Sequence, residues 1–353
     1  MVRLQWYPND EVNLKAGKTE MEYRELVAAA ELNLKVKNIL KNYSAGEGTY
    51  LRQGAETNYV NRFNLQYFER FGFKFRLIDS QEASTEITLF DRKFRTPILG
   101  AAISGMNDIT DKPLNKIASG IRDSGSMMWL GMVTSEQFKE VAEIGVPTVR
   151  IVKPFRDTQV MIRELKEAEE AGAIAVGTDI DFFYGSKRGD KPVAPKTMGP
   201  KSLEELKRLA QVTKLPFILK GVLSAEDAEK ALAIGAGGIV VSNHAGVVID
   251  YAAHPLEVLP EIKKVIGDRM PIFIDSGFRR GSDVMKALAL GADAVLVGWA
   301  LVMGLAANGS QGVAEIMNIL TAELQRIMSV TGCKRVSDID SGILVARHHF
   351  IGH

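Results

Sequence analysis

The chain lacks cysteine pairs and long apolar runs. Cys333 is the single cysteine among 353 residues, which excludes an intrachain disulfide and a four-cysteine iron–sulfur or zinc site within the chain. No run approaches the roughly 18 apolar residues that span a bilayer. The N-terminal residues also lack the apolar region of a signal peptide. We therefore expect a protein of the reducing cytoplasm that needs no membrane.

A charge bias is missing too. The formal net charge is +1, so no basic surface for nucleic acid is indicated. Hydrophobic residues make up 46% and charged residues 25%, which is typical of a soluble globular enzyme. Three histidines gather near the C-terminus, in residues 347–353. We expect a disordered or docked tail there rather than a metal site.

Short apolar runs alternate with helical patterns from Pro97 onward. Helical patterns lie at 202–213, 224–235 and 281–291, and several of the helices open with Ser or Asp caps and close at Gly. No Gly-x-Gly-x-x-Gly follows the first run, which disfavours a doubly wound open sheet. The alternation instead predicts an α/β fold, a (β/α)8 TIM barrel. The eight runs lie near 97–102, 127–132, 148–152, 174–178, 217–220, 238–242, 271–275 and 294–298.

We expect one domain over residues 1–353. It divides into an N-terminal helical extension over 1–95, the barrel over 96–335 and a C-terminal tail over 336–353. Apolar residues at helical spacing predict a helix within about 20–42 of the extension. Residues 180–201 form an added loop between the fourth and fifth runs, of a length typical of lids or disordered segments.

Three polar positions follow apolar runs, where a parallel barrel places its chemistry. His244 ends the sixth run in Ser-Asn-His, and an imidazole is suited to general-base work. Lys220 ends the fifth run among apolar neighbours that imply burial. In 275–280, Gly277 allows backbone N–H groups to approach a phosphate and Arg279 supplies a cation. The alternatives are a structural histidine, a surface lysine and a simple helix cap.

These segments resemble the FMN-dependent α-hydroxy-acid oxidase and dehydrogenase family, which includes glycolate oxidase and lactate oxidase. Residues 242–250 are similar to its Ser-Asn-His-Gly-Gly-Arg-Gln signature, which ends in a hydrophobic residue and aspartate. Residues 219–228 resemble its strand 5 and the following helix, and 274–284 its strand 7 phosphate loop. Residues 286–298 and 331–333 match as well. The resemblance covers nearly the whole chain and implies an FMN-binding barrel.

The resemblance also assigns roles. His244 would accept the substrate's hydroxyl proton, Asp179 would stabilise the resulting imidazolium, and Lys220 would stabilise the reduced flavin. Asp275 would bind the ribityl hydroxyls. Many family members are tetramers or octamers, so a homotetramer is expected. The remaining implied cofactor contacts are Ala102, Ile103, Ser104, Ser242, Ser276, Gly277, Phe278, Arg279, Gly298 and Trp299. Trp299 stands where an arginine usually follows the last glycine, so one phosphate cation is missing.

The chain departs from the family where the substrate binds. Val247 replaces the arginine that grips the substrate carboxylate, and Tyr43 alone remains of an adjacent tyrosine pair. Lys153 aligns with the substrate tyrosine of the third run and Ile151 with a flavin-binding glutamine. A slip of one residue would turn Arg150 inward instead. Either cation would offer a displaced anion site.

Two further departures concern the flavin. Side chains that usually hydrogen-bond it from the second and fourth runs align with Gly131 and Gly177. We predict an FMN-dependent oxidoreductase acting on a CH–OH group by hydride transfer to flavin N5, with His244 as base. The substrate is a small molecule other than a simple α-hydroxy acid, and the electron acceptor is unknown. The alternatives are an isomerase without net redox change, an ordinary lactate-like oxidase with a replaced anion anchor, and a non-catalytic FMN-binding barrel.

Overall fold

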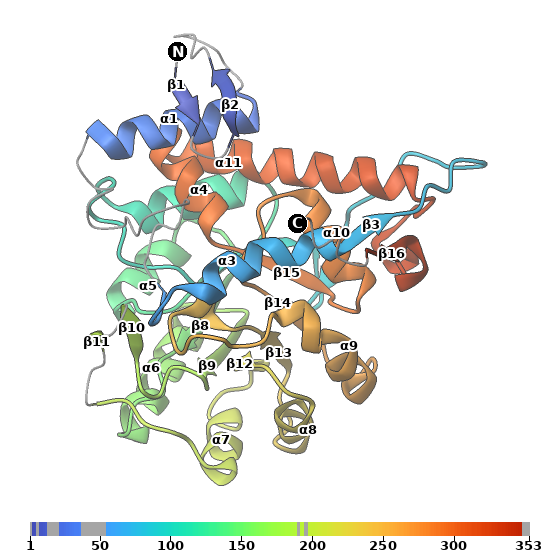
Figure 1. Cartoon of the computed structure of the whole chain (residues 1–353). Helices are drawn as coiled ribbons and strands as arrows, with labels where there is room; N and C mark the ends of the chain where they lie inside the picture. Colours follow the sequence, from blue (N-terminus) through green and yellow to red (C-terminus); the bar gives the residue numbers. More distant parts are fainter. Residues whose placement is uncertain are drawn as a thin grey trace.

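The computed structural model describes residues 2–4, 7–12, 21–36, 54–188, 191–193 and 197–347. Within them, parallel strands close into a barrel in chain order (Figure 1). Each strand coincides with one of the apolar runs of the sequence, so the predicted TIM barrel is confirmed. The strands are β6 (Ile98–Gly100), β7 (Met128–Leu130), β8 (Thr148–Val152), β9 (Ala175–Asp179), β12 (Phe217–Val222), β13 (Gly238–Val241), β14 (Ile272–Ile274) and β15 (Ala294–Val297).

Helices alternate with these strands and surround the barrel (Figure 1). The predicted helical patterns correspond to α7, α8 and α10, and serine side chains cap α7 and α8 as expected. No helix of the described residues is long and apolar enough to cross a membrane. The helices are α4 (Pro113–Asp123), α5 (Ser135–Ala142), α6 (Thr158–Glu170), α7 (Leu203–Ala210), α8 (Ala225–Ala233), α9 (Pro255–Ile266), α10 (Gly281–Ala289) and α11 (Trp299–Val330).

Side chains along each strand alternate between the barrel interior and the helix layer. Ile151, Ile218 and Phe273 belong to the interior cluster and are fully buried. Their neighbours on the strands pack outward against the helices. Because the period is two residues, the positions two after these interior residues also face inward, at the carboxyl end of the barrel. Those positions are Lys153, Lys220 and Asp275.

A hairpin closes the opposite, amino end. Its strands are β4 (Ile87–Leu89) and β5 (Arg92–Phe94), which pair in antiparallel register. Leu89 and Phe94 are buried in the same cluster as the barrel interior. The Phe90 ring lies 5.9 Å from that of Phe273. The hairpin thus seals the amino end with apolar side chains.

The N-terminal extension contains strands as well as the predicted helices. Helix α1 (Tyr23–Val36) lies beside α11 (Figure 1). Strand β16 (Leu344–Ala346) pairs with β3 (Phe71–Phe73), so the tail docks onto the extension through the last described residues. The three C-terminal histidines lie outside the described residues. The remaining elements are β1 (Val2–Leu4), β2 (Tyr7–Val12), α3 (Tyr59–Gln66), η1 (Tyr67–Arg70), η2 (His244–Gly246), η3 (Val336–Asp338) and η4 (Ser341–Ile343).

The added loop over 180–201 has secondary structure of its own. Strands β10 (Ser186–Arg188) and β11 (Lys191–Val193) pair antiparallel within it. Its first residues carry Asp181 and Phe182 back over the carboxyl end of the barrel, where both contact His244. The loop therefore contributes side chains to the same end of the barrel as the predicted site.

Candidate active site

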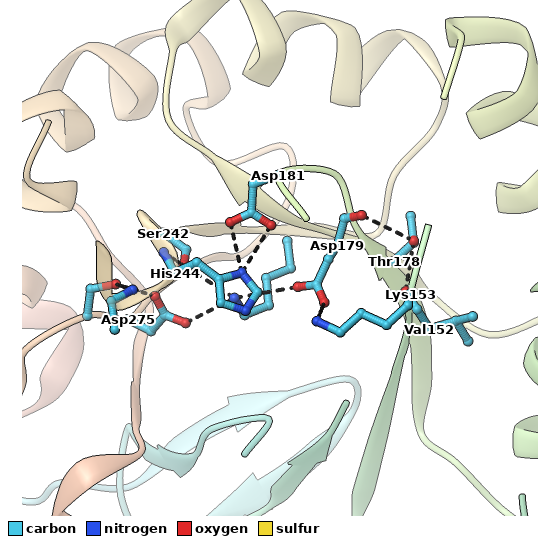
Figure 2. A network of polar contacts seen from close by, with 11 residues as sticks. Val152, Lys153, Thr178, Asp179, Asp181, Ser242, His244 and Asp275 are labelled. Carbon is cyan, nitrogen blue, oxygen red and sulfur yellow. Dashed lines mark hydrogen bonds and ion pairs between the residues drawn. The ribbon is translucent and has the colours of Figure 1, made fainter. Parts of the chain in front are cut away.

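A layer of charged side chains lies across the carboxyl end of the barrel (Figure 2). Lys153, Asp179, Lys220 and Asp275 are each at most 9% exposed. They come from β8, β9, β12 and β14 or the residue that follows each strand. Because strand alternation aims all four inward, the sequence brings together charges that are far apart along the chain. Burial makes each charge dependent on its partners.

Lys220 lies at the centre of this layer. Its Nζ is 3.3 Å from Asp275 Oδ2, 3.6 Å from Asp179 Oδ1 and 3.3 Å from Ser242 Oγ. Burial alone would lower the pKa of Lys220. The carboxylates of Asp275 and Asp179 outweigh burial and raise that pKa above its ordinary value. Lys220 is therefore a fixed cation, as expected for the residue that faces a flavin.

Asp179 is held mainly by lysines. Its Oδ2 accepts a short hydrogen bond from Lys153, in addition to the Lys220 contact. Burial would raise the pKa of Asp179, but the charges of Lys153 and then Lys220 hold the pKa well below its ordinary range. Lys153 Nζ also lies 3.9 Å from the centre of the Phe182 ring. The Lys153–Asp179 pair is a buried structural unit beside the site.

His244 contacts a different aspartate from the predicted one. Its Nδ1 lies 2.9 Å and 3.1 Å from the two carboxylate oxygens of Asp181. Figure 2 shows Asp181 pointing at the imidazole while Asp179 points at Lys153. The expected role of Asp179 in stabilising the imidazolium stays a prediction, because Lys153 takes its Oδ2 while the charges of Asp179 and His244 still interact. Sequence analysis missed Asp181, which follows Asp179 by two residues, just after the end of β9.

The backbone around His244 is unusual. His244, Ala245 and Gly246 have positive φ values of 52°, 53° and 72°. Two of the three are not glycine, so the loop carries conformational strain. The backbone N–H of His244 donates to Ser242 Oγ at 3.0 Å, and that of Ala245 donates to Ser276 Oγ at 3.2 Å. Predicted cofactor residues Ser242 and Ser276 therefore also hold the catalytic loop.

Two other residues of the signature anchor the loop to the N-terminal extension. Asn243 exchanges amide hydrogen bonds with Asn64, at 3.0 Å and 2.7 Å. Asp250 accepts from the backbone N–H of Thr57 at 2.9 Å and of Val60 at 3.1 Å, at the start of α3. Burial acts to raise the pKa of Asp250, but hydrogen bonds from the Thr57 hydroxyl and from these backbone N–H groups hold that pKa below its ordinary value. Their role is structural.

The facing of the third strand is now defined. Lys153 is inward, and Arg150 lies between β8 and the outer helices. The Arg150 guanidinium donates to the backbone oxygens of Gly131 and Val133 and to Glu164 on α6. Burial lowers the pKa of Arg150, and Glu164 opposes that shift. Arg150 therefore cannot serve as an anion site inside the barrel. Of the two cations expected to offer a displaced anion site, Lys153 is the one that faces inward.

The loop after β14 has the features of a phosphate site. Ser276 and Gly277 have positive φ values of 81° and 92°. A Cβ on Gly277 would lie 3.0 Å from the Asn64 carbonyl oxygen, so the position requires glycine. The Arg279 guanidinium is buried and lies 4.2 Å from the Trp299 ring centre. Trp299, the replacement for the family arginine, thus supports the cation that remains.

The carboxyl ends of the neighbouring strands β6, β7 and β15 carry mostly small side chains or glycine. Ala102, Ile103 and Ser104 follow β6 and are half-buried. A Cβ on Gly131 would meet only Ala102, at 3.5 Å or more, so this position is open. Gly298 follows β15, and a Cβ there would lie 3.1 Å from Ile103. Gly131, Gly298 and Ala102 therefore add little side-chain volume at these strand ends.

Gly177 has a structural reason to be glycine. A Cβ there would lie 2.1 Å from the backbone oxygen of Ile218 on the adjacent strand. The missing flavin-binding side chain at this position therefore reflects close strand packing. Of the predicted substrate residues, Val247 is half-buried at the end of η2. Tyr43 lies outside the described residues.

Comparison with known proteins gives a consistent result. The family model for FMN-dependent dehydrogenase matches residues 41–202 and 193–346. A 2-hydroxyacid oxidase of Dictyostelium discoideum is 30% identical over 358 residues, 92% of each chain. An L-lactate oxidase of Lactobacillus jensenii is 31% identical, covering 82% of this chain and 79% of its own. An arginine-to-leucine variant of a mandelate oxidase, solved with 2-hydroxy-phenylacetamide, superimposes with a TM-score of 0.82. It is 28% identical and covers 94% of this chain and 100% of its own.

The residues present fit FMN. The phosphate would lie against the positive-φ loop and Arg279, the ribityl chain against Asp275, and the ring beside Lys220. The side chain of Phe278, also predicted at the cofactor, is buried against Phe68, with ring centres 5.0 Å apart. The family model spans most of the chain, and the barrel carries the matching loop, lysine and histidine. The chain therefore belongs to the FMN-dependent dehydrogenase family, as an oxidoreductase with FMN as its cofactor.

Proposed function

We propose that this oxidoreductase oxidises a hydroxylated substrate that carries no carboxylate beside the reacting carbon. FMN, when bound, supplies the acceptor for the hydride that leaves this carbon, at its N5 atom. His244 accepts the hydroxyl proton, so the alcohol becomes a carbonyl and the two electrons leave with the hydride. Lys220 supplies a fixed positive charge beside the ring.

The observation that carries this proposal is the charge balance around His244. Asp179, Asp181 and Asp275 provide three carboxylates, and Lys153 and Lys220 provide two ammonium groups. Each of these lysines already has a carboxylate partner. A substrate carboxylate entering here would meet an excess of negative charge. It would also lack the bidentate arginine that Val247 replaces, at a cost of several kcal/mol.

A relative's ligand supports the same substrate class. The mandelate oxidase variant in which leucine replaces an arginine was solved with 2-hydroxy-phenylacetamide. This ligand is the uncharged amide of a hydroxy acid. It differs from mandelate only in the group that a carboxylate anchor would grip. A related barrel with one arginine fewer thus accommodates a neutral analogue.

A second candidate is an ordinary α-hydroxy-acid oxidase whose anion anchor is Lys153. The inward position of Lys153 favours it, as do relatives with names such as glycolate oxidase and L-lactate oxidase. In this case the substrate would compete with Asp179 for the ammonium group. An isomerase acting on a diphosphate would need several cations inside the barrel, and Arg150 faces the outer helices instead.

An anaerobic titration of the FMN-loaded protein separates the two candidates. Mandelamide and mandelate share one carbon skeleton, so their rates of flavin bleaching compare the amide and carboxylate directly. We expect the amide to be the faster substrate. Val247→Arg should raise kcat/KM for mandelate by about 10- to 100-fold, the value of one charge-assisted anchor.

Val247→Leu is the matched control and should leave the preference unchanged. Faster bleaching by mandelate in the unmodified protein would refute the proposal in favour of the Lys153-anchored oxidase. Bleaching by neither compound, in a protein that also ignores lactate, glycolate and other alcohols, would argue against hydroxyl oxidation altogether.

A further inference from the structure

Two aspartates compete for the space beside His244. Asp179 ends β9, and Asp181 follows two residues later. One oxygen of each carboxylate and one imidazole nitrogen lie within 4.8 Å of one another. Either aspartate is thus close enough to interact with the imidazole charge. What differs is the partner that each one actually holds.

Lys153 determines which aspartate contacts His244. It donates to Asp179 Oδ2, and it is itself buried, with the Phe182 ring on one side. A buried ammonium strongly favours a carboxylate partner, because its desolvation is otherwise uncompensated. Lys153 therefore fixes Asp179 toward β8 and away from the imidazole. Asp181 is left to approach Nδ1 with both oxygens.

We infer that Asp181 is the residue that orients His244 and sets its tautomer, and that Lys153 has withdrawn Asp179 from this role. The inference rests on the proposed function of His244 as a base. It makes Asp181 a positioning residue and Lys153 its indirect determinant.

The chemical consequence concerns the imidazole protons. A carboxylate only accepts hydrogen bonds, so neutral His244 beside Asp181 must carry its proton on Nδ1. Nε2 is then the nitrogen with a free lone pair for the substrate hydroxyl. Without Asp181 the proton would distribute over both nitrogens, and part of the protein would present the wrong nitrogen.

The test uses the FMN-loaded protein with ¹⁵N-labelled histidine. NMR of the unmodified protein should show the Nδ1–H tautomer for His244, assigned by its loss in His244→Gln. In Asp181→Asn we expect a mixture of tautomers and a fall of about 10- to 100-fold in the rate of flavin reduction. Flavin absorbance and the unfolding midpoint report whether each variant is folded and loaded.

The double variant Lys153→Met/Asp181→Asn provides the reciprocal test. Removing Lys153 frees Asp179 to turn to the imidazole, so the double variant should recover the Nδ1–H tautomer. It should also regain about tenfold in rate over Asp181→Asn. A second double variant, Lys153→Met/Asp179→Asn, should keep the Nδ1–H tautomer, because Asp181 is still present.

The inference is overturned if Asp181→Asn keeps the tautomer and the rate, or if the first double variant is no better than Asp181→Asn. Failure of the proposed function looks different. In that case His244→Gln itself would retain flavin reduction, whatever the two aspartate variants do.

Discussion

A buried histidine that takes no part in the proposed proton transfer should make the fold sensitive to acid. His254 precedes α9 and is fully buried, with its ring stacked on Tyr67 at 4.4 Å. Its Nε2 donates to the Asn64 carbonyl oxygen at 3.1 Å, and its Nδ1 accepts from the Leu256 N–H at 3.0 Å. Both nitrogens of the neutral ring therefore have a hydrogen-bond partner. A second proton, on Nδ1, would point at the Leu256 N–H, which is also a donor.

Burial lowers the pKa of His254 to about 3, from 6.5, against the Asn64 carbonyl and with help from the Arg70 charge. Between these two values the unfolded chain binds a proton that the folded protein does not. Stability must therefore fall as pH falls below about 6.5, by about 1.4 kcal/mol per unit. The loss is about 2 kcal/mol from pH 7 to pH 5 and about 4 kcal/mol from pH 7 to pH 3.

The assay is urea unfolding of the FMN-free protein at pH 7 and pH 5, with His254→Asn as the comparison. Asparagine still caps a helix, so the variant keeps α9 while removing the titrating ring. The variant should be less stable at pH 7, but its deficit should shrink by about 2 kcal/mol at pH 5. Parallel stability curves for the two proteins would refute the reasoning, because all other titrating groups are shared.

Two further changes test the site. Asp179→Ala leaves Lys153 buried without its carboxylate and should lower the free energy of unfolding by about 3–5 kcal/mol. The double variant Lys153→Met/Asp179→Ala should recover most of this loss. If the single and double variants were equally unstable, the ion-pair account would be contradicted. Gly277→Ala adds a strained φ of 92° and a 3.0 Å contact with Asn64, so FMN should dissociate more readily by fluorescence titration. Gly145→Ala, with a φ of 86° and open space around it, is the control that should retain FMN.

The barrel was predictable because local signals and the global fold agree. Each strand is a compact apolar run, and caps such as Ser202 and Ser224 mark the helices between them. The facing of β8 was not predictable. Both faces of this strand are buried, so its sequence has no alternation of polar and apolar residues that would indicate which side chains point inward. The acceptors that stabilise Arg150 outside the barrel come from segments distant in sequence.

The site was predictable only in part. His244, Lys220 and the phosphate loop could be located by residue type and place, and the structure brings them to one end of the barrel. The hydrogen-bond partner of each charged side chain could not be predicted from the sequence in the same way. Whether Asp179 meets Lys153 or His244 depends on the approach of β8 to β9 and on the path of the loop to Asp181. A two-residue spacing was the available signal for Asp181.

The bonds from Asn243 and Asp250 to residues 57–64 bear on how this enzyme can be re-engineered. The catalytic loop is tethered to a segment that precedes the first barrel strand by more than thirty residues. A chimaera that grafts a relative's barrel behind this N-terminus would need a matching asparagine and aspartate to keep its histidine in place. The exchangeable unit is therefore not the barrel, but the barrel together with the helix that holds its catalytic turn.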